Sequence, residues 1–231
     1  MTKVVKYLMI INAGLWLLTV LAGHFQNWVV YEEMALTPAK VFPGFHVWEL
    51  FTYMWFHSLT DYYHILFNML FLWMFGGTLE QSWGSRAFLK FYLICGTGAG
   101  LVVFVIGILF YPTVPTVGAS GAIYGLVAAW AIAFPDRMVY LFGIFPIRGR
   151  YFALIPIGFA VLDFIVGGSG ISHAAHLGGL AIGAIMVTGL WRPSRMRNRL
   201  RYLYLKRKLK VIDGEQYRRR KNPPGSGGYW N

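Results

Sequence analysis

Residues 118–130 read Gly118-Ala119-Ser120-Gly121, followed by the uncharged run Ala122-Ile123-Tyr124-Gly125-Leu126-Val127-Ala128-Ala129-Trp130. The run is typical of a membrane helix, with Ser120 at its N-terminal end among small neighbours. Unpaired N–H groups at a helix N-terminus carry partial positive charge and stabilise an anion that forms beside them. An acyl-transfer nucleophile needs this environment, but small-residue clusters also serve close helix packing. The stretch leaves both interpretations open.

The composition indicates a membrane protein. The 231-residue chain is 57% hydrophobic and only 13% charged, whereas about 25% of the residues in a soluble domain are charged. The net charge of +12 is concentrated after residue 191, where 13 Lys and Arg face only Asp213 and Glu215. A basic segment directly after an apolar span marks the cytoplasmic side and anionic lipid, and nucleic-acid binding is a poor interpretation of it.

Uncharged runs predict an all-α membrane protein, a bundle of six membrane-spanning helices. A span needs about 20 apolar residues, and the breaks between spans contain Pro, Gly or charged residues. Two prolines in residues 111–116, for example, divide one long uncharged run into two spans. The predicted spans are residues 7–31, 62–79, 91–110, 119–134, 151–166 and 171–191.

The basic residues predict the topology. Lys and Arg lie at the N-terminus, in two connections and in the tail, so both termini are expected in the cytoplasm. We therefore divide the chain into a membrane domain, residues 1–191, and a basic tail, residues 192–231, which is amphipathic at first and then disordered. The aromatic-rich residues 31–61 are expected at the outer interface, and residues 138–147 as a short interfacial segment on the inner side.

Polar side chains within the spans gather at one depth, near the outer ends. Such residues are functional candidates by default, because they are costly in a bilayer. They are Ser120, His64 and Asn68 (at i and i+4), His173, His176 and Asp163. Gly179 and Gly183 lie on the same stripe as His176, and Gly121 and Gly125 form a matching small-xxx-small stripe. Pairing the two stripes would bring His176 towards Ser120, with Tyr124 packed against the imidazole.

Two other interpretations of these side chains remain open. A metal site would use His64, His173, His176 and Asp163, but neither a His-Glu-x-x-His motif nor a cysteine cluster is present. Alternatively, His and Asn only join helices by hydrogen bonds. Asp163 is interpreted as structural support, and His24, His46 and His57 as interfacial or structural residues.

Four segments, spread from the second span to the sixth, are considered as one set of motifs. They are His64-Ile65-Leu66-Phe67-Asn68-Met69-Leu70, Leu79-Glu80 with Gly84-Ser85, Gly118-Ala119-Ser120-Gly121-Ala122-Ile123-Tyr124-Gly125, and Ala175-His176-Leu177-Gly178-Gly179 with Gly183. In this order they resemble the motifs of the rhomboid intramembrane serine proteases. One departure is Trp48-Glu49, where the family often has Trp-Arg, and it concerns the anchoring of the first outer loop.

The resemblance implies a Ser–His dyad. Ser120 would attack the peptide carbonyl, and His176 would act as general base and then general acid. The oxyanion would be held by the side chains of His64 and Asn68 and by the backbone N–H of Ser120. Tyr124 would pack on the dyad histidine, with Gly118, Gly121, Gly179 and Gly183 in support.

The resemblance also implies the substrate class. Family substrates are membrane proteins that are cut in or near a transmembrane segment, here near the outer membrane face, and residues 31–61 and 151–166 are the candidate gates. No metal or other cofactor is expected. The alternative is a non-catalytic protein of the same fold that binds transmembrane clients. The expected location is the inner membrane of a bacterial cell.

Overall fold

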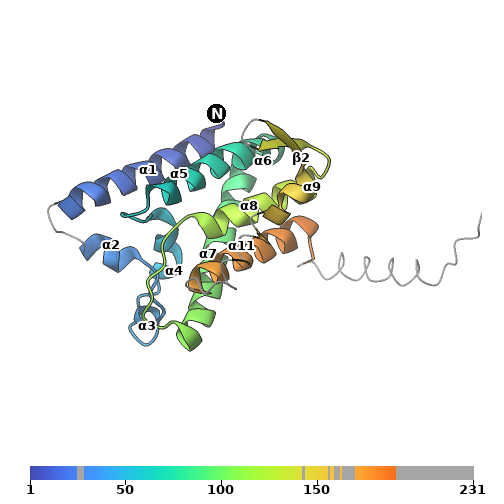
Figure 1. The fold of residues 1–231 in the computed structure, drawn as a ribbon. Helices are drawn as coiled ribbons and strands as arrows, with labels where there is room; N and C mark the ends of the chain where they lie inside the picture. The colour runs from blue at the N-terminus through green and yellow to red at the C-terminus, as the bar shows by residue number, and fades with distance from the viewer. Residues whose placement is uncertain (25–28, 142–143, 156, 159–161, 163–169, 191–231) are drawn as a thin grey trace, which may run out of the picture. The chain divides into compact units, whose positions relative to one another are not determined.

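The computed structural model describes residues 1–24, 29–141, 144–155, 157–158, 162 and 170–190 (Figure 1). The helices and strands below belong to the first of two compact units, Met1–Thr188; the second is Gly189–Asn231. The predicted tail, residues 192–231, lies outside the described residues, and so do Asp163 and much of the predicted fifth span.

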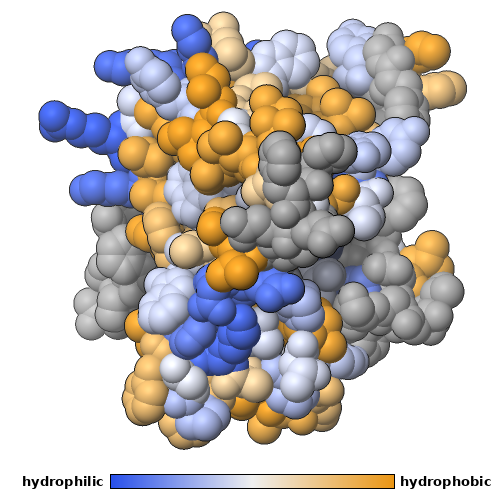
Figure 2. Space-filling view, turned by 90° about the vertical axis from the view of Figure 1, so that its left-hand side faces the viewer, coloured by the Kyte–Doolittle hydropathy of each residue, from blue (hydrophilic) through white to orange (hydrophobic). Residues whose placement is uncertain are grey.

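Three described helices are long and apolar enough to cross a membrane. They lie within α1 (Lys3–His24), α7 (Ser85–Phe110) and α11 (Gly170–Thr188), and a shorter apolar helix is α8 (Ser120–Ala133). The prediction of a mainly helical membrane fold is therefore confirmed. Many large apolar side chains on these helices are exposed, among them Leu18 and Leu109, and Figure 2 shows hydrophobic residues over much of the face that it draws. Lipid would cover such a surface.

The bounds of the first and third predicted spans differ from the structure. Helix α1 starts at Lys3 rather than residue 7, and Val29–Met34 form the separate helix α2. Helix α7 starts at Ser85, six residues before the predicted span. Basic residues in the first turns of both helices therefore lie inside the helix rather than before it, because a helix continues beyond its apolar part where its ends reach water.

The second predicted span, residues 62–79, was expected to close at Gly76-Gly77 and Glu80, but it is part of one continuous helical run. It consists of α5 (Tyr62–Phe71), the π-helical η2 (Leu72–Gly76) and α6 (Gly77–Trp83). The run ends at Gly84, whose φ of 81° favours glycine. Gly76 serves packing instead, since a Cβ there would stand only 3.0 Å from the Val5 side chain and 3.1 Å from Phe88.

A buried carboxylate joins the end of this run to the start of α1. Glu80 accepts hydrogen bonds from the backbone N–H groups of Val4 and Val5, each at 2.9 Å, and from the Ser85 hydroxyl at 2.6 Å. A negative charge is favourable at a helix N-terminus, where N–H groups have no partner within the helix. Glu80 therefore caps α1 from a segment more than 70 residues away in the sequence.

Helix α8 is the central helix of the described unit. Ten of its 14 residues are buried, and it packs against α7 and α11 (Figure 1). The paired glycine stripes expected from the sequence are present. A Cβ on Gly179 would meet the Gly121 carbonyl oxygen, and a Cβ on Gly183 would stand 2.5 Å from the Gly125 carbonyl oxygen. Only glycine allows the two backbones to approach this closely.

Residues 29–61 form a connection before α5, with the short helices α2, α3 (Pro38–Val41), α4 (Glu49–Thr52) and η1 (Tyr53–Trp55). Leu36 and Thr116 exchange two backbone hydrogen bonds of 2.9 Å, which tie the connection to the loop before α8. Glu49 is fully buried and accepts the Thr37 N–H at 2.7 Å, with His46 Nδ1 at 3.2 Å. At the position where the family often has arginine, a carboxylate thus anchors this loop.

Two paired strands lie in the segment expected at the inner interface, residues 138–147. Strands β1 (Met138–Leu141) and β2 (Phe145–Arg148) pair antiparallel, with Met138 opposite Arg148. The all-α prediction is incomplete here, because strands of four residues carry too few side chains to show a period of two. The helix α9 (Gly149–Phe152) follows directly.

Candidate active site

Ser120 and His176 meet at the interface of α8 and α11. The Ser120 Oγ lies 3.0 Å from His176 Nε2, which is hydrogen-bonding distance. The paired glycines directly below both residues hold the two backbones close, so the short serine side chain reaches the imidazole. Tyr124 is one turn further along α8. Its ring stacks on one face of the His176 imidazole, and the two rings are parallel.

His64 faces the same space from the start of α5. Its Nδ1 accepts a hydrogen bond from the Ser58 backbone N–H at 3.2 Å. A neutral imidazole with an accepting Nδ1 carries its proton on Nε2. This Nε2 lies close to Gly118, where a Cβ would stand 2.6 Å from it and 3.7 Å from Ser120 Oγ. The Nε2–H donor of His64 therefore lies beside Ser120, in a space that is open because residue 118 is glycine.

Asn68 lies one turn below His64 and is buried. Its amide nitrogen donates to the His64 carbonyl oxygen at 2.8 Å, and the residue does not line the cavity that holds Ser120. The Ser120 N–H belongs to the first residue of α8 and so has no acceptor within that helix. Of the three residues that supply the predicted oxyanion donors, His64 and Ser120 therefore line the cavity, whereas Asn68 does not.

The cavity between these residues has a volume of about 260 Å³. Besides Ser120, His176 and His64, its lining contains Tyr53, Thr116, Val117, Ser172 and Ala175. These five residues were not predicted as site residues. Ser172 is one helical turn before His176, and this spacing could have revealed it. No local pattern indicates Tyr53, which reaches the site because its carbonyl accepts the Gly118 N–H at 3.0 Å.

Among the residues that the structure describes, the histidines are not grouped as metal ligands. Across the described part of the chain, no group of three His, Cys, Asp or Glu side chains is placed to hold a metal ion. His173 is buried in α11, and the ring of His57 lies 5.2 Å from that of His64. Burial, and then repulsion from His64 when that imidazole is protonated, lower the pKa of His57 to about 3. His57 is therefore neutral in the folded protein.

The arrangement has the parts that acyl transfer requires. An imidazole nitrogen within reach of a serine hydroxyl can take its proton, and N–H donors directed beside the serine can stabilise an oxyanion. A sequence comparison places this geometry in a family, since residues 44–193 match the family model of the Rhomboid domain. The chain belongs to the rhomboid family. The matched range includes every residue that lines the cavity of this rhomboid.

Curated relatives carry rhomboid names from several sources. This rhomboid is 33% identical over 131 residues to Rhomboid protease GluP of Bacillus subtilis, a match covering 56% of this chain and 24% of that protein. It is 28% identical over 137 residues to Rhomboid protein 1, mitochondrial, of Saccharomyces cerevisiae, covering 55% of this chain and 38% of the relative. Rhomboid-like protein 11, chloroplastic, of Arabidopsis thaliana is 27% identical over 194 residues, and this match covers 78% of this chain and 63% of the relative.

Each match spans less than two thirds of the relative's own length. The matches therefore concern the rhomboid domain and not the whole of each relative. Their names place relatives in mitochondria and chloroplasts as well as in a bacterium. The comparisons thus support a membrane protein of the rhomboid family, but they do not support the bacterial inner membrane in particular, which stays a prediction.

Proposed function

We propose that this rhomboid is an intramembrane serine endopeptidase that cleaves transmembrane proteins near the outer membrane face. The observation that carries the proposal is the 3.0 Å contact between Ser120 Oγ and His176 Nε2 at the wall of a cavity. A rhomboid relative whose name states that it is a protease gives further support.

The proposed reaction proceeds in two stages. Ser120 Oγ attacks the scissile carbonyl carbon while its proton passes to His176 Nε2, and the carbonyl oxygen becomes an oxyanion. The Nε2–H of His64 and the Ser120 N–H donate to this oxygen, and Asn68 supplies a further donor or holds His64 in place. His176 then protonates the leaving amine as the C–N bond breaks. Water, deprotonated by His176, hydrolyses the acyl-enzyme and restores the serine.

We further propose the six-span topology with both termini in the cytoplasm, a membrane domain of residues 1–191 and a tail of residues 192–231 that binds anionic lipid. In this topology the start of α5 and the start of α8 lie on the outer side, so the cavity opens in the outer half of the membrane. Residues 31–61 and 151–166 are the proposed gates through which a transmembrane segment enters. The substrates are membrane proteins, and no nucleic acid or cofactor takes part.

Labelling with a fluorophosphonate, which reacts with activated serines, tests the proposal on the full chain in membranes. The native chain should be labelled, whereas the Ser120→Ala and His176→Ala variants should not. Ser172→Ala is the matched control because Ser172 lines the same cavity but is not a member of the proposed dyad, and it should keep its label. A folded native chain that takes no label, or label that persists in Ser120→Ala, would instead favour the non-catalytic protein that binds transmembrane clients.

A further inference from the structure

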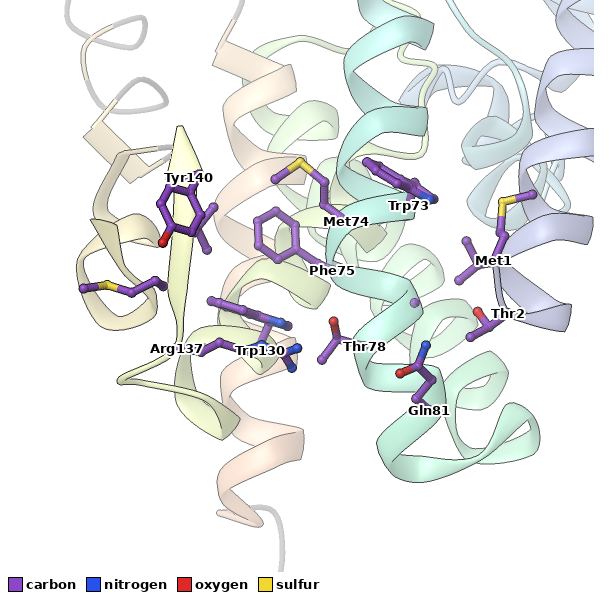
Figure 3. Close-up of a pocket in the computed structure, with 14 residues that line it drawn as sticks. Met1, Thr2, Trp73, Met74, Phe75, Thr78, Gln81, Trp130, Arg137 and Tyr140 are labelled. Carbon is purple, nitrogen blue, oxygen red and sulfur yellow. The ribbon is translucent and has the colours of Figure 1, made fainter. Parts of the chain in front are cut away.

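A second cavity lies at the opposite end of α8 from Ser120. Its volume is about 470 Å³, and it is bounded by the start of α1, by η2 and α6, by Trp130 of α8 and by β1 (Figure 3). Trp130 is ten residues after Ser120, which corresponds to about 15 Å along a helix. We call this second cavity the inner cavity. None of its lining residues lines the candidate active site.

The inner cavity is polar on one side and apolar on the other. Figure 3 shows Arg137, Thr78 and Gln81 towards one edge, with the indole nitrogen of Trp130 on the side of its ring that faces Thr78. Trp73, Met74 and Tyr140 lie towards the opposite edge. A ligand that matches this lining carries an anionic or polar group at one end and a hydrocarbon part at the other.

The order of apolar and polar residues along the inner cavity matches the order from the middle of a bilayer to its cytoplasmic surface. The continuous helical run from Tyr62 to Trp83 starts beside the active-site cavity with His64 and reaches the inner cavity with Trp73 and Gln81. In the proposed topology, Trp73 is thus nearer the middle of the bilayer and Gln81 nearer the cytoplasmic water. The head group and the acyl chain of a phospholipid follow this order.

The charges at the polar edge favour an anion. Within the described residues, Arg137 has no acidic partner; its guanidinium lies over the Phe134 ring, 5.7 Å from the centroid. The neighbouring Asp136 is instead paired with Arg150. The buried Nε1 of Trp130 has no hydrogen-bond acceptor among the described residues. Exposed cations near the inner surface attract anionic lipid, and a guanidinium binds a phosphate through two N–H donors.

We propose that the inner cavity binds one anionic phospholipid, with its phosphate at Arg137 and an acyl chain along Trp73 and Met74. The basic tail of the chain itself is a poor occupant, because its excess of Lys and Arg would be repelled by Arg137. The site is distinct from general attraction of lipid to the tail, since it is a cavity with an ordered polar and apolar lining.

The test uses the full chain in phosphatidylcholine nanodiscs that contain a small fraction of phosphatidylglycerol with a photoreactive acyl chain. After illumination, label should map to the peptides that contain Trp73 to Gln81 and Arg137 to Tyr140. Excess unlabelled phosphatidylglycerol should compete, whereas further phosphatidylcholine should not. Arg137→Gln should lower this labelling about fivefold, the effect of about one basic residue near an anionic surface.

Arg86→Gln is the matched control. Arg86 is also exposed and on the inner side, but it does not line the cavity. It should leave labelling of these peptides unchanged, and the fluorophosphonate reaction of Ser120 should be unchanged in both variants. Equal loss of labelling in Arg86→Gln would show general surface attraction and overturn the proposal. So would equal competition by phosphatidylcholine, or label found only on peptides outside the cavity.

Discussion

The Tyr124 ring lies parallel to the His176 imidazole, with centroids 4.2 Å apart and an angle of 4° between the planes. The stack uses one face of the imidazole, while its Nε2 edge contacts Ser120 at 3.0 Å. Tyr124 therefore restricts rotation of the ring that must take the serine proton. Its position on α8, four residues after Ser120, places both residues on one face of the same helix.

Loss of this stack should slow the dyad. An aromatic pair contributes about 0.5–1.5 kcal/mol beyond its buried area, so Tyr124→Ala should lower the rate of fluorophosphonate labelling about two- to tenfold. Tyr124→Phe keeps the ring and should label at close to the native rate. Time courses of labelling in membranes measure both. A slow Tyr124→Phe variant would mean that the hydroxyl, rather than the ring, has the main role.

Gly118→Ala should slow labelling by about 10²–10³-fold without abolishing the fold. The new Cβ would stand 2.6 Å from His64 Nε2, so it would displace the proposed oxyanion donor. Removal of one such donor lowers a rate by about 10²–10³-fold. Gly84→Ala is the control for backbone strain, because φ is positive at both glycines, 129° at Gly118 and 81° at Gly84, but a Cβ on Gly84 would have no neighbouring atom within 4 Å. If Gly84→Ala lost as much activity as Gly118→Ala, strain and not the contact with His64 would be responsible.

Gly179→Ala should destabilise the protein. Its Cβ would press on the Gly121 carbonyl, and backbone cannot turn aside as a flexible side chain does. Overpacking of this kind costs about 1–3 kcal/mol, and separation of α8 from α11 would also weaken the Ser120–His176 contact. Gly14→Ala, on α1 and with nothing within 4 Å of the Cβ, should be neutral or slightly stabilising. Thermal unfolding in detergent compares the two, and equal melting temperatures would contradict the packing argument.

Stability should fall as the pH falls below about 6.5, in part because of His57. Burial, followed by repulsion from His64 when that imidazole is protonated, lowers its pKa from 6.5 to about 3 in the folded protein. Between these values the unfolded chain binds a proton that the folded chain does not, so acid favours unfolding. At pH 5 this proton uptake by the unfolded chain lowers the free energy of unfolding by about 2 kcal/mol relative to its value well above pH 6.5.

His57→Phe tests this assignment. Neither ring nitrogen of His57 has a hydrogen-bond partner among the described residues, so an apolar ring should keep or raise the melting temperature at pH 7.5. The drop in melting temperature between pH 7.5 and pH 5 should be smaller than in the native chain. An unchanged drop would assign the acid sensitivity to other groups.

Local sequence signals correctly predicted the close approach of helices that carry small residues. The glycine stripes of α8 and α11 could be paired in advance, since small-xxx-small spacing has few uses in a membrane other than close approach. Glycine misled as a sign of a helix end at Gly76-Gly77: the helical run continues through both residues, and Gly76 packs against Val5 and Phe88. Glycine marks both a helix end and a close contact, and only the neighbours across the interface distinguish the two.

By itself, the sequence determined that this chain belongs in a membrane and that Ser120 and His176 lie next to the glycine stripes of two helices, because composition and spacing are local properties. The tertiary structure alone decided that Ser120 Oγ and His176 Nε2 meet at 3.0 Å and that Ser58 leaves the His64 proton on Nε2. It also decided that Tyr53 joins the cavity and that residues 138–141 pair with residues 145–148. These features depend on contacts between segments far apart in the chain, for which no local pattern exists.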